Sequence, residues 1–464
     1  MFELCALASV SFFEIVLAKG IGFSSFLVQL YDIMVYSMYL KSMRSKNINI
    51  FLLVLGIIIS SVGLIYSLTQ LLELRASNDG GSEVTDLMNH SLRIEFKDTI
   101  NLSNNTDDSV YGQVRSSDKN IYVVWQESVP GNTARNYEIF FKKSNDSGDS
   151  FGKKIQLTDN VGFSEHPQMS SEDKNVYVVW ADDTNVNKQI YFKKSDDGGN
   201  SFGEQLLLSD SNSNAFNQEV SSFGDNVYIV WLEKVPDGLY RIMIASSNDG
   251  GDTFHKPMAL SEKTMAQTFP KISTTDNHVY VTWNVENQPS MKSGVYFISS
   301  SDNGMTFSNV SKLNMEDKDF GEPQVASFGS KVYVIWGGSE TNKLKSLSLT
   351  RSDDYGKTFS ETKKLVETEH GRLNEPSNVE ITTDQNNRVF IAWQDITDTA
   401  DKEEIFFASS TDSGESFGDV TNLSNNADIS ECPSIITVED MVFATWEDLT
   451  PGNHEVLFSR GTII

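Results

Sequence analysis

Acidic side chains occupy two recurring positions in the larger part of the chain, and they are the residues best suited to chemistry. One set follows a tryptophan by two residues: Glu127, Asp182, Glu233, Asp395 and Asp448. The other set precedes short β-type runs: Glu165, Glu322, Glu375 and Glu431. Carboxylates gathered at one opening would suit a hard divalent cation such as Ca²⁺, which takes about 6–8 oxygen ligands. Alternatively, the Trp-x-acid pattern simply caps the end of a strand and faces solvent, and no cofactor is needed.

Histidine and cysteine provide weaker candidates. The histidines show no ligand spacing, so a His-based metal site is not expected: His90, His166, His255, His278, His370 and His454. The chain has two cysteines, Cys5 and Cys432, which excludes a disulfide scaffold and a Cys-based zinc site. Cys432 has no local His motif, and we interpret it as a small buried residue rather than a nucleophile.

Net charge limits the kinds of partner. The 464 residues include 64 acidic and 37 Lys or Arg residues, which gives a formal charge of −27. The whole excess lies in residues 83–464, because the first 82 residues contain equal numbers of acids and bases. Such a surface repels phosphate backbones, so nucleic-acid binding is not expected.

The elements that must position these side chains repeat along the chain. A β-rich phrase ends in tryptophan seven times, at intervals that average about 53 residues: Trp125, Trp180, Trp231, Trp283, Trp336, Trp393 and Trp446. All seven tryptophans of the protein are used in this way. A fixed period of this length indicates a repeat architecture.

A second phrase, Ser-x-Asp-x-Gly-x-(Ser/Thr)-Phe, follows each of the first six tryptophans. Its Ser and Asp side chains can bond to nearby amides and its Gly permits a positive φ, so the phrase predicts a tight turn. We therefore expect its aspartates to be structural rather than catalytic: Asp146, Asp197, Asp249, Asp302, Asp354 and Asp412.

Each period contains four short β-type runs separated by linkers rich in Asn, Asp, Gly and Ser, which is typical of a β-propeller blade. The last repeat lacks a fourth strand, but residues 98–106 closely match residues 419–427, a fourth strand with its exit loop. The N-terminal strand is therefore predicted to complete the last blade and close the ring. The predicted fold is an all-β, seven-bladed propeller of four-stranded blades over residues 96–464.

At the Ser-x-Asp-x-Gly phrases the chain resembles the Asp-box (BNR-repeat) proteins, whose best-known members are the sialidases. The resemblance covers residues 96–464, with six complete boxes in register. It implies that each box joins the third and fourth strands of a blade, on the face opposite an active site. Asp boxes also occur in propellers without catalysis and in other glycosidases, so the fold that it implies does not decide the function.

Resemblance to sialidases also implies three arginines for a substrate carboxylate, a Tyr–Glu nucleophile pair and an Asp acid. The candidates that could reach the ligand face are Arg135, Arg241 and Arg372, with Tyr137 and Tyr240 nearby in sequence. Arg93 departs from the family's Phe/Tyr-Arg-Ile-Pro opening, because Glu follows Arg-Ile here. Sialidases are also usually six-bladed. Catalysis of this type is therefore not favoured.

The N-terminal part predicts a membrane anchor. Residues 50–68 form an uncharged apolar run of about the length that spans a bilayer, within a predicted transmembrane segment over 49–70. Lys41, Arg44 and Lys46 precede the run, and this positive-inside bias places the following residues on the exterior side. Residues 1–48 either include a second spanning helix at 21–40 or contain the true translation start, at Met43. Residues 71–95 are predicted to form a polar tether.

Together these features predict a membrane-anchored, extracytoplasmic propeller that binds a glycan, a surface polymer or an envelope protein. Its partners would be that ligand and, through the N-terminal helix, the membrane. The first alternative is a sialidase-like exo-glycosidase, and the second is a purely structural envelope component.

Overall fold

The computed structural model describes residues 92–464, apart from 130–135, 211, 265–266, 286–291, 315–320, 340–344, 368–376 and 397–401. The chain separates into two units, residues 1–90 and 91–464, and the described residues belong to the second. The predicted anchor at 49–70 and the two interpretations of residues 1–48 lie outside them. Within the described part, no helix has the length and apolar character needed to cross a bilayer.

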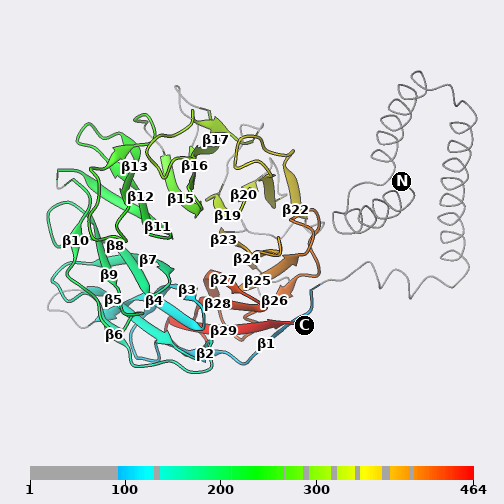
Figure 1. Cartoon of the computed structure of the whole chain (residues 1–464). Coiled ribbons are helices and arrows are strands. Elements are labelled where there is room, and N and C mark those ends of the chain that lie inside the picture. Colours follow the sequence, from blue (N-terminus) through cyan, green and yellow to red (C-terminus); the bar gives the residue numbers. More distant parts are fainter. Residues whose placement is uncertain are drawn as a thin grey trace, which may run out of the picture. The chain divides into compact units, whose positions relative to one another are not determined.

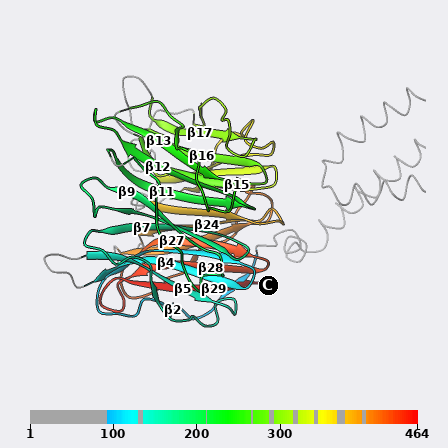
Figure 2. The same cartoon turned by 60° about the vertical axis from the view of Figure 1, so that its left-hand side comes forward.

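The described residues form seven four-stranded antiparallel blades arranged in a ring, with the first strand of each blade innermost (Figure 1). The first strands contact one another in an unbroken circle, from β3 through β7, β11, β15, β19, β23 and β27 back to β3. In the turned view of Figure 2, β7, β11 and β15 lie side by side. The predicted seven-bladed propeller of four-stranded blades is therefore confirmed.

The strands of the first three blades follow the chain in order. Blade 1 contains β3 (Ser109–Ser117), β4 (Asn120–Val129), β5 (Asn136–Ser144) and β6 (Ile155–Gln156). Blade 2 contains β7 (Ser164–Glu172), β8 (Asn175–Asp182), β9 (Gln189–Ser195) and β10 (Leu206–Leu207). Blade 3 contains β11 (Asn214–Phe223), β12 (Asn226–Lys234), β13 (Tyr240–Ser247) and β14 (Met258–Ala259).

The next three blades have the same order. Blade 4 contains β15 (Gln267–Thr275), β16 (His278–Val285), β17 (Gly294–Ser300) and β18 (Ser311–Lys312). Blade 5 contains β19 (Gln324–Phe328), β20 (Lys331–Ser339), β21 (Lys345–Ser352) and β22 (Lys363–Glu367). Blade 6 contains β23 (Ser377–Thr383), β24 (Val389–Ile396), β25 (Glu403–Ser410) and β26 (Thr421–Asn422).

Blade 7 is built from both ends of the ring. It contains β27 (Ser430–Val438), β28 (Met441–Asp448) and β29 (Glu455–Ile463), and β29 also pairs with β1 (Ile94–Phe96) and β2 (Ile100–Asn101). Ile100 faces Phe458 in the register that fourth strands occupy in the other blades. The pairing extends back to Ile94, two residues before the predicted start of the propeller. This closure leaves no gap between the last blade and the first.

The hydrophobic core lies between blades rather than within one layer. The second strand of each blade carries the buried tryptophan that ends the repeated phrase. In four blades this indole stacks on an aromatic ring of the third strand, as Trp125 does on Phe140 with ring centres 6.3 Å apart. The described buried residues form seven apolar clusters, each shared by two neighbouring blades, including blades 7 and 1. Each blade is therefore stabilised by both of its neighbours.

The Ser-x-Asp-x-Gly phrase forms the same hydrogen-bonded turn six times. In blade 2, Ser195 Oγ donates to Asp197 Oδ1 (2.8 Å) and accepts from the Gly199 amide (2.8 Å). Ser201 donates its amide to Oδ1 (2.9 Å) and its hydroxyl to Oδ2 (2.7 Å) of the same carboxylate. Hydrogen bonds from Ser201 and then from Ser195 lower the pKa of Asp197 to about 2, although partial desolvation opposes them. The turn is thus self-contained, and its aspartate is occupied by its own loop.

These turns also join neighbouring blades. In four of the turns the final Phe packs edge-on against a third-strand ring of the preceding blade, as Phe202 does on Phe141 with centres 5.1 Å apart. Gly199 has a φ of +74°, and a side chain there would collide with the same Phe141 ring. Lys143 of blade 1 donates to the carbonyl of Gly198 (3.1 Å). The turn therefore needs glycine both for its backbone angle and for close packing.

We expect Asp197→Ala to lower the thermal midpoint by about 2–4 °C, because the turn loses hydrogen bonds to a charged group worth roughly 1–2 kcal/mol. Asp196→Ala is the matched control, since Asp196 is the exposed neighbour outside this network. Differential scanning calorimetry of both variants measures the effect. Equal midpoints for the two variants would contradict the structural role of the turn.

Candidate functional site

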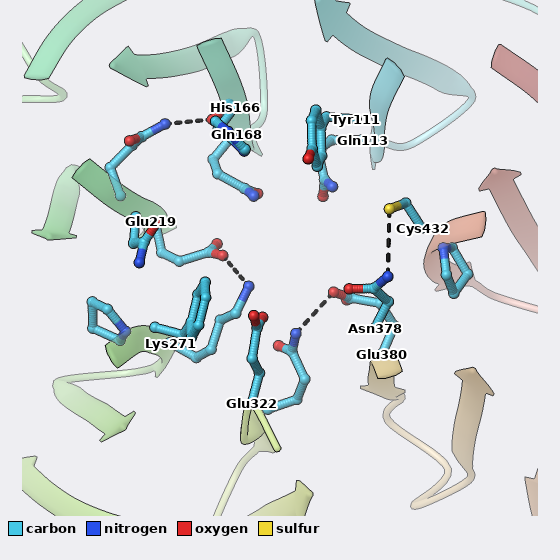
Figure 3. A pocket seen from close by; sticks show the side chains of 16 residues that line it. Tyr111, Gln113, His166, Gln168, Glu219, Lys271, Glu322, Asn378, Glu380 and Cys432 are labelled. Carbon is cyan, nitrogen blue, oxygen red and sulfur yellow. Dashed lines mark hydrogen bonds and ion pairs between the residues drawn. The ribbon is translucent and has the colours of Figure 1, made fainter. Parts of the chain in front are cut away.

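A cavity of about 470 Å³ lies at the centre of the ring (Figure 3). Every blade contributes the residue at the equivalent position at the start of its innermost strand, and these seven residues form what we call the upper ring. They include six residue types: Tyr111, His166, Asn217, Phe269, Glu322, Asn378 and Cys432. The repeat therefore supplies the positions, and the side chain at that position varies from blade to blade.

Six of the seven upper-ring residues lie at a β-bulge in the left-handed region of φ. Their φ angles are +57° for Tyr111, +53° for His166, +54° for Asn217, +45° for Phe269, +54° for Asn378 and +52° for Cys432. At each of them the register between the first and second strands shifts. A bulge turns a side chain away from the pleat, and left-handed φ at an aromatic residue costs about 1–3 kcal/mol. Strain of this kind at a cavity indicates a functional site.

The neighbouring blade holds these bulges in place. In three blades the residue after the tryptophan accepts a hydrogen bond from the upper-ring amide of the next blade. Gln126 Oε1 accepts from the His166 amide (2.6 Å), and Gln394 Oε1 accepts from the Cys432 amide (3.3 Å). Glu447 Oε1 accepts from the Tyr111 amide (2.7 Å) across the closure of the ring. Packing between blades therefore determines where the cavity side chains point.

A second set of side chains, which we call the lower ring, lies two residues further along the innermost strands. Its cavity-lining members are Gln113, Gln168, Glu219, Lys271, Gln324 and Glu380. Lys271 forms an ion pair with Glu219, and Gln324 Nε2 donates to Glu380 Oε1 (3.0 Å). The lower ring presents amides and carboxylates, with one ammonium group, to the cavity.

Two carboxylates of the cavity, those of Glu380 and Glu322, have pKa values raised toward the neutral form. Burial raises the pKa of Glu380 to about 7, although Lys271 and Arg115 oppose the shift. Burial also raises the pKa of Glu322, again against the attraction of Lys271. Burial by itself would lower the pKa of Lys271, but Glu219, Glu380 and Glu322 outweigh it and raise that pKa. The cavity therefore keeps a charged lysine, and its Glu380 titrates near neutral pH.

Tyr111, His166 and Cys432 form the side of the cavity next to the closure. The rings of Tyr111 and His166 lie 4.2 Å apart. Burial lowers the pKa of His166, so its imidazole is neutral at pH 7. Burial and the nearby Glu447 raise the pKa of the Cys432 thiol, which also accepts a weak hydrogen bond from Asn378 Nδ2 (3.4 Å). Cys432 is only partly buried, rather than a buried core residue as predicted, and a neutral thiol is a poor nucleophile.

The structure places the five Trp-x-acid carboxylates, all of which it describes, in buried positions outside the cavity lining: Glu127, Asp182, Glu233, Asp395 and Asp448. Glu127 accepts from Trp125 Nε1 (3.1 Å) and pairs with Lys154 (2.6 Å). Asp448 accepts from Trp446 Nε1 (3.1 Å) and from Ser430 Oγ (2.9 Å). Their oxygens accept hydrogen bonds or form ion pairs at the ends of the strands, so these carboxylates do not gather at one opening of the ring as predicted.

Of the acids predicted at strand starts, Glu322 lines the cavity. Glu165 forms an ion pair with Lys188, and Glu431 lies beside Glu403 and opposite Glu447. Burial and Glu403 raise the pKa of Glu431 to about 7, and burial raises that of Glu447 to about 7. Glu375 lies outside the described residues, and in its blade the structure places Asn378 and Glu380 in the two rings.

The arginine and tyrosine candidates do not converge within the described residues. Arg135 and Arg372 lie outside those residues. Arg241 pairs with Glu233 (2.5 Å), and it does not line the cavity. Tyr240 packs against Phe216 with ring centres 6.2 Å apart, and Tyr137 packs against Phe163 at 6.4 Å. Both tyrosines lie outside the cavity lining.

Sequence reasoning missed the lower ring, and in the upper ring it missed Tyr111, Asn217 and Asn378. The available signal was the proline that opens the first strand, because the residues on both of its sides face the cavity in three blades. Those pairs are His166 and Gln168, Phe269 and Lys271, and Glu322 and Gln324. Period-two alternation along a strand explains why both neighbours of a proline share one side.

Comparisons with known proteins support the fold alone. No protein-family profile and no curated protein matches the chain. A crystal structure of a protein of unknown function from Dyadobacter fermentans is similar, with 14% identity and a TM-score of 0.50 over 80% of this chain and 99% of that one. A Trypanosoma rangeli sialidase mutant with trans-sialidase activity has 12% identity and a TM-score of 0.45, over 80% of this chain and 59% of that one. The GH93 α-L-arabinofuranosidase of Fusarium graminearum has 13% identity and a TM-score of 0.46, over 64% and 92% of the respective chains.

Glu380 makes stability depend on pH. Its pKa is raised from 4.5 to about 7 in the folded protein, so the unfolded chain loses this proton first as the pH rises. Stability should therefore fall between about pH 4.5 and pH 7 and then level off for this group. We expect Glu380→Gln to match the wild-type thermal midpoint near pH 4.5 and to exceed it by about 2–4 °C at pH 8.

The matched control is Glu204→Gln, because Glu204 is an exposed glutamate outside the cavity. Its thermal midpoint should follow the wild type at every pH. A Glu380→Gln variant that is less stable than the wild type at pH 8 would show that the charged form of Glu380 stabilises the fold.

Proposed function

We propose that the central cavity binds an uncharged or amino-bearing sugar at the end of a glycan. The observation that carries the proposal is the chemistry of the two rings, which combine amides and carboxylates with aromatic rings around about 470 Å³. That volume is within the roughly 300–1,000 Å³ of small-molecule sites. Planar amides and carboxylates can each contact two adjacent hydroxyl groups of a sugar.

Aromatic side chains complete this recognition. Tyr111 and Phe269 lie in the upper ring and have apolar ring faces, on which the C–H face of a sugar can pack. Both lie at β-bulges with positive φ, so the direction in which their side chains leave the backbone is set before a ligand arrives. A rigid site of this kind loses little conformational entropy on binding.

The charge of the cavity sets the class of sugar. The lining contains three carboxylates, from Glu219, Glu322 and Glu380, against the ammonium group of Lys271. None of the described lining residues is an arginine, the usual partner of a sugar carboxylate. A sialic acid would therefore meet like charge, whereas a neutral or amino sugar would not.

We also propose that residues 50–68 anchor the propeller at the exterior surface of a membrane, where glycans and envelope components are available. This rests on the uncharged run and the preceding basic residues. Protease added to intact cells should then degrade the propeller. Full protection of the propeller would contradict exterior display.

The binding test uses the full chain, purified in a mild detergent, on an array of neutral, amino and sialylated glycans, followed by calorimetric titration of the best ligand. We expect Glu322→Gln and Phe269→Asn each to weaken binding about tenfold, the effect of losing roughly 1.4 kcal/mol. Phe269→Asn should not lower the thermal midpoint, because Asn tolerates positive φ. Glu204→Gln is the control and should bind like the wild type.

Preferential binding of sialylated glycans, or binding that neither cavity variant weakens, would refute this assignment. Glycoside hydrolysis is a second candidate function, favoured by the neutral-range pKa of Glu380 beside other carboxylates. Fluorogenic neutral and amino glycosides test it. Turnover that Glu380→Gln abolishes would make the cavity an active site, and intact glycosides with retained binding would leave recognition as its role.

A further inference from the structure

A cluster of two carboxylates and an imidazole lies in blade 7, outside the cavity lining. Glu431 of β27 is the direct cross-strand partner of Glu447 of β28, and His454 immediately precedes β29. One ligand atom from each of these three side chains lies within 4.8 Å of the others. Like charges directly opposite in a sheet are destabilising, so this pair needs compensation.

In blade 2 the equivalent positions hold a balanced pair of opposite charges. Glu165 there corresponds to Glu431, since each precedes the upper-ring bulge, and Lys188 corresponds to His454, since each precedes the third strand. Lys188 forms an ion pair with Glu165. In blade 7 a histidine replaces the lysine, although the blade has gained a second carboxylate. The cluster in blade 7 therefore has one more carboxylate than its counterpart in blade 2, and it lacks the permanent positive charge of the lysine.

The second carboxylate is not required by the fold. Gln126 and Gln394 occupy the position of Glu447 in blades 1 and 6, and each accepts the same hydrogen bond from the next blade. Glu447 Oε1 accepts a hydrogen bond from the Tyr111 amide, and a glutamine at this position could accept the same bond. The other oxygen, Oε2, lies 3.9 Å from His454 Nδ1. That distance is too long for a hydrogen bond.

The imidazole nitrogen provides a second, independent observation. His454 Nδ1 is excluded from solvent and has no hydrogen-bond partner. The His454 backbone is fixed, because its carbonyl accepts from the Ser109 amide (2.7 Å). A buried ring nitrogen without a partner costs free energy unless something binds it. The carboxylates of Glu447 and Glu431 both lie within 4.8 Å of a ring nitrogen of His454.

We propose that Glu431, Glu447 and His454 bind one divalent cation of the Zn²⁺ and Mn²⁺ class. A divalent cation would neutralise both carboxylates and accept the lone pair of His454 Nδ1. Ligand atoms around Zn²⁺ at about 2.0–2.1 Å are roughly 3.4 Å apart, so small side-chain rotations would close this cluster. Mixed imidazole and carboxylate ligands suit a borderline ion, whereas Ca²⁺ prefers oxygen ligands alone. Glu403, beside Glu431, is available as a further oxygen ligand.

This site goes beyond the proposed sugar binding and does not depend on it. It is nevertheless close to the cavity in the chain, because Glu431 precedes the lining residue Cys432 and Glu447 holds the amide of the lining residue Tyr111. A bound ion would also link β27, β28 and the loop before β29, since Glu431, Glu447 and His454 lie there.

The test titrates the full chain, purified in a mild detergent and treated with EDTA, with ZnCl₂ and MnCl₂, using CaCl₂ as the comparison ion. Calorimetry should show one Zn²⁺ or Mn²⁺ per chain and at least tenfold weaker Ca²⁺ binding. Glu447→Gln introduces the residue found at the equivalent position of blades 1 and 6, and His454→Lys introduces the residue found at the equivalent position of blade 2. Each should weaken Zn²⁺ binding at least tenfold.

Thermal unfolding provides a readout that separates binding from damage. The metal-free His454→Lys variant should melt at or above the wild-type temperature, because lysine supplies the missing positive charge, and Zn²⁺ should no longer raise its midpoint. His255→Ala is the control, since His255 is an exposed histidine whose Nδ1 already contacts the Ser246 carbonyl (3.0 Å). Unchanged Zn²⁺ affinity in His454→Lys and Glu447→Gln, or no binding to the wild type, would overturn the proposal.

Discussion

Packing between neighbouring blades is the constraint on which this structure depends. A four-stranded sheet has two faces, and each blade here buries them against the blades before and after it. An array of such sheets has no stable end, so the ring must close. The cluster that contains Trp125 and Phe458 joins blade 1 to blade 7, and β2 pairs with β29 to complete that contact. Without closure, two apolar sheet faces would be exposed to water.

The two ends of the blades use this scaffold in different ways. The Ser-x-Asp-x-Gly turns follow the third strands, at the end of the blade remote from the bulges, since Ser195 pairs with Val176 at the start of β8. Six of them share one hydrogen-bond pattern, with the aspartates bound within their own loops. At the other end, the upper ring has six residue types at its seven positions. Repetition therefore maintains the fold at one end, and variation creates the site at the other.

Backbone strain and buried charge are both concentrated at the end of the blades that carries the upper ring. The bulged residues include Tyr111, His166 and Phe269, for which positive φ is unfavourable, and acceptors from the adjacent blade hold the amides of two of them. Carboxylates are also drawn into enclosed positions, where their pKa values rise. The scaffold can support these costs because seven interblade clusters stabilise it. Stability and function are thus supplied by separate parts of the same repeat.

Much of the architecture could be predicted from the sequence, because it depends on periodic local features. The seven tryptophans, the six turns and the match between residues 98–106 and 419–427 determine the blade count and the closing strand. Each of these is a short-range pattern of residue types, and its structural consequence is the same wherever it occurs. The roles of the turn aspartates follow for the same reason, since each aspartate finds its partners within four residues.

The site was decided by tertiary structure. The Trp-x-acid carboxylates are a regular pattern, yet they accept bonds at the strand ends and remain outside the cavity. Lys271 faces Glu219 and Gln324 faces Glu380 only because adjacent blades bring their innermost strands together. Glu431, Glu447 and His454 likewise meet through cross-strand register rather than sequence spacing. Local patterns specify which strands form, whereas bulges and the angle between blades specify which side chains meet, because those depend on contacts between residues about 50 positions apart.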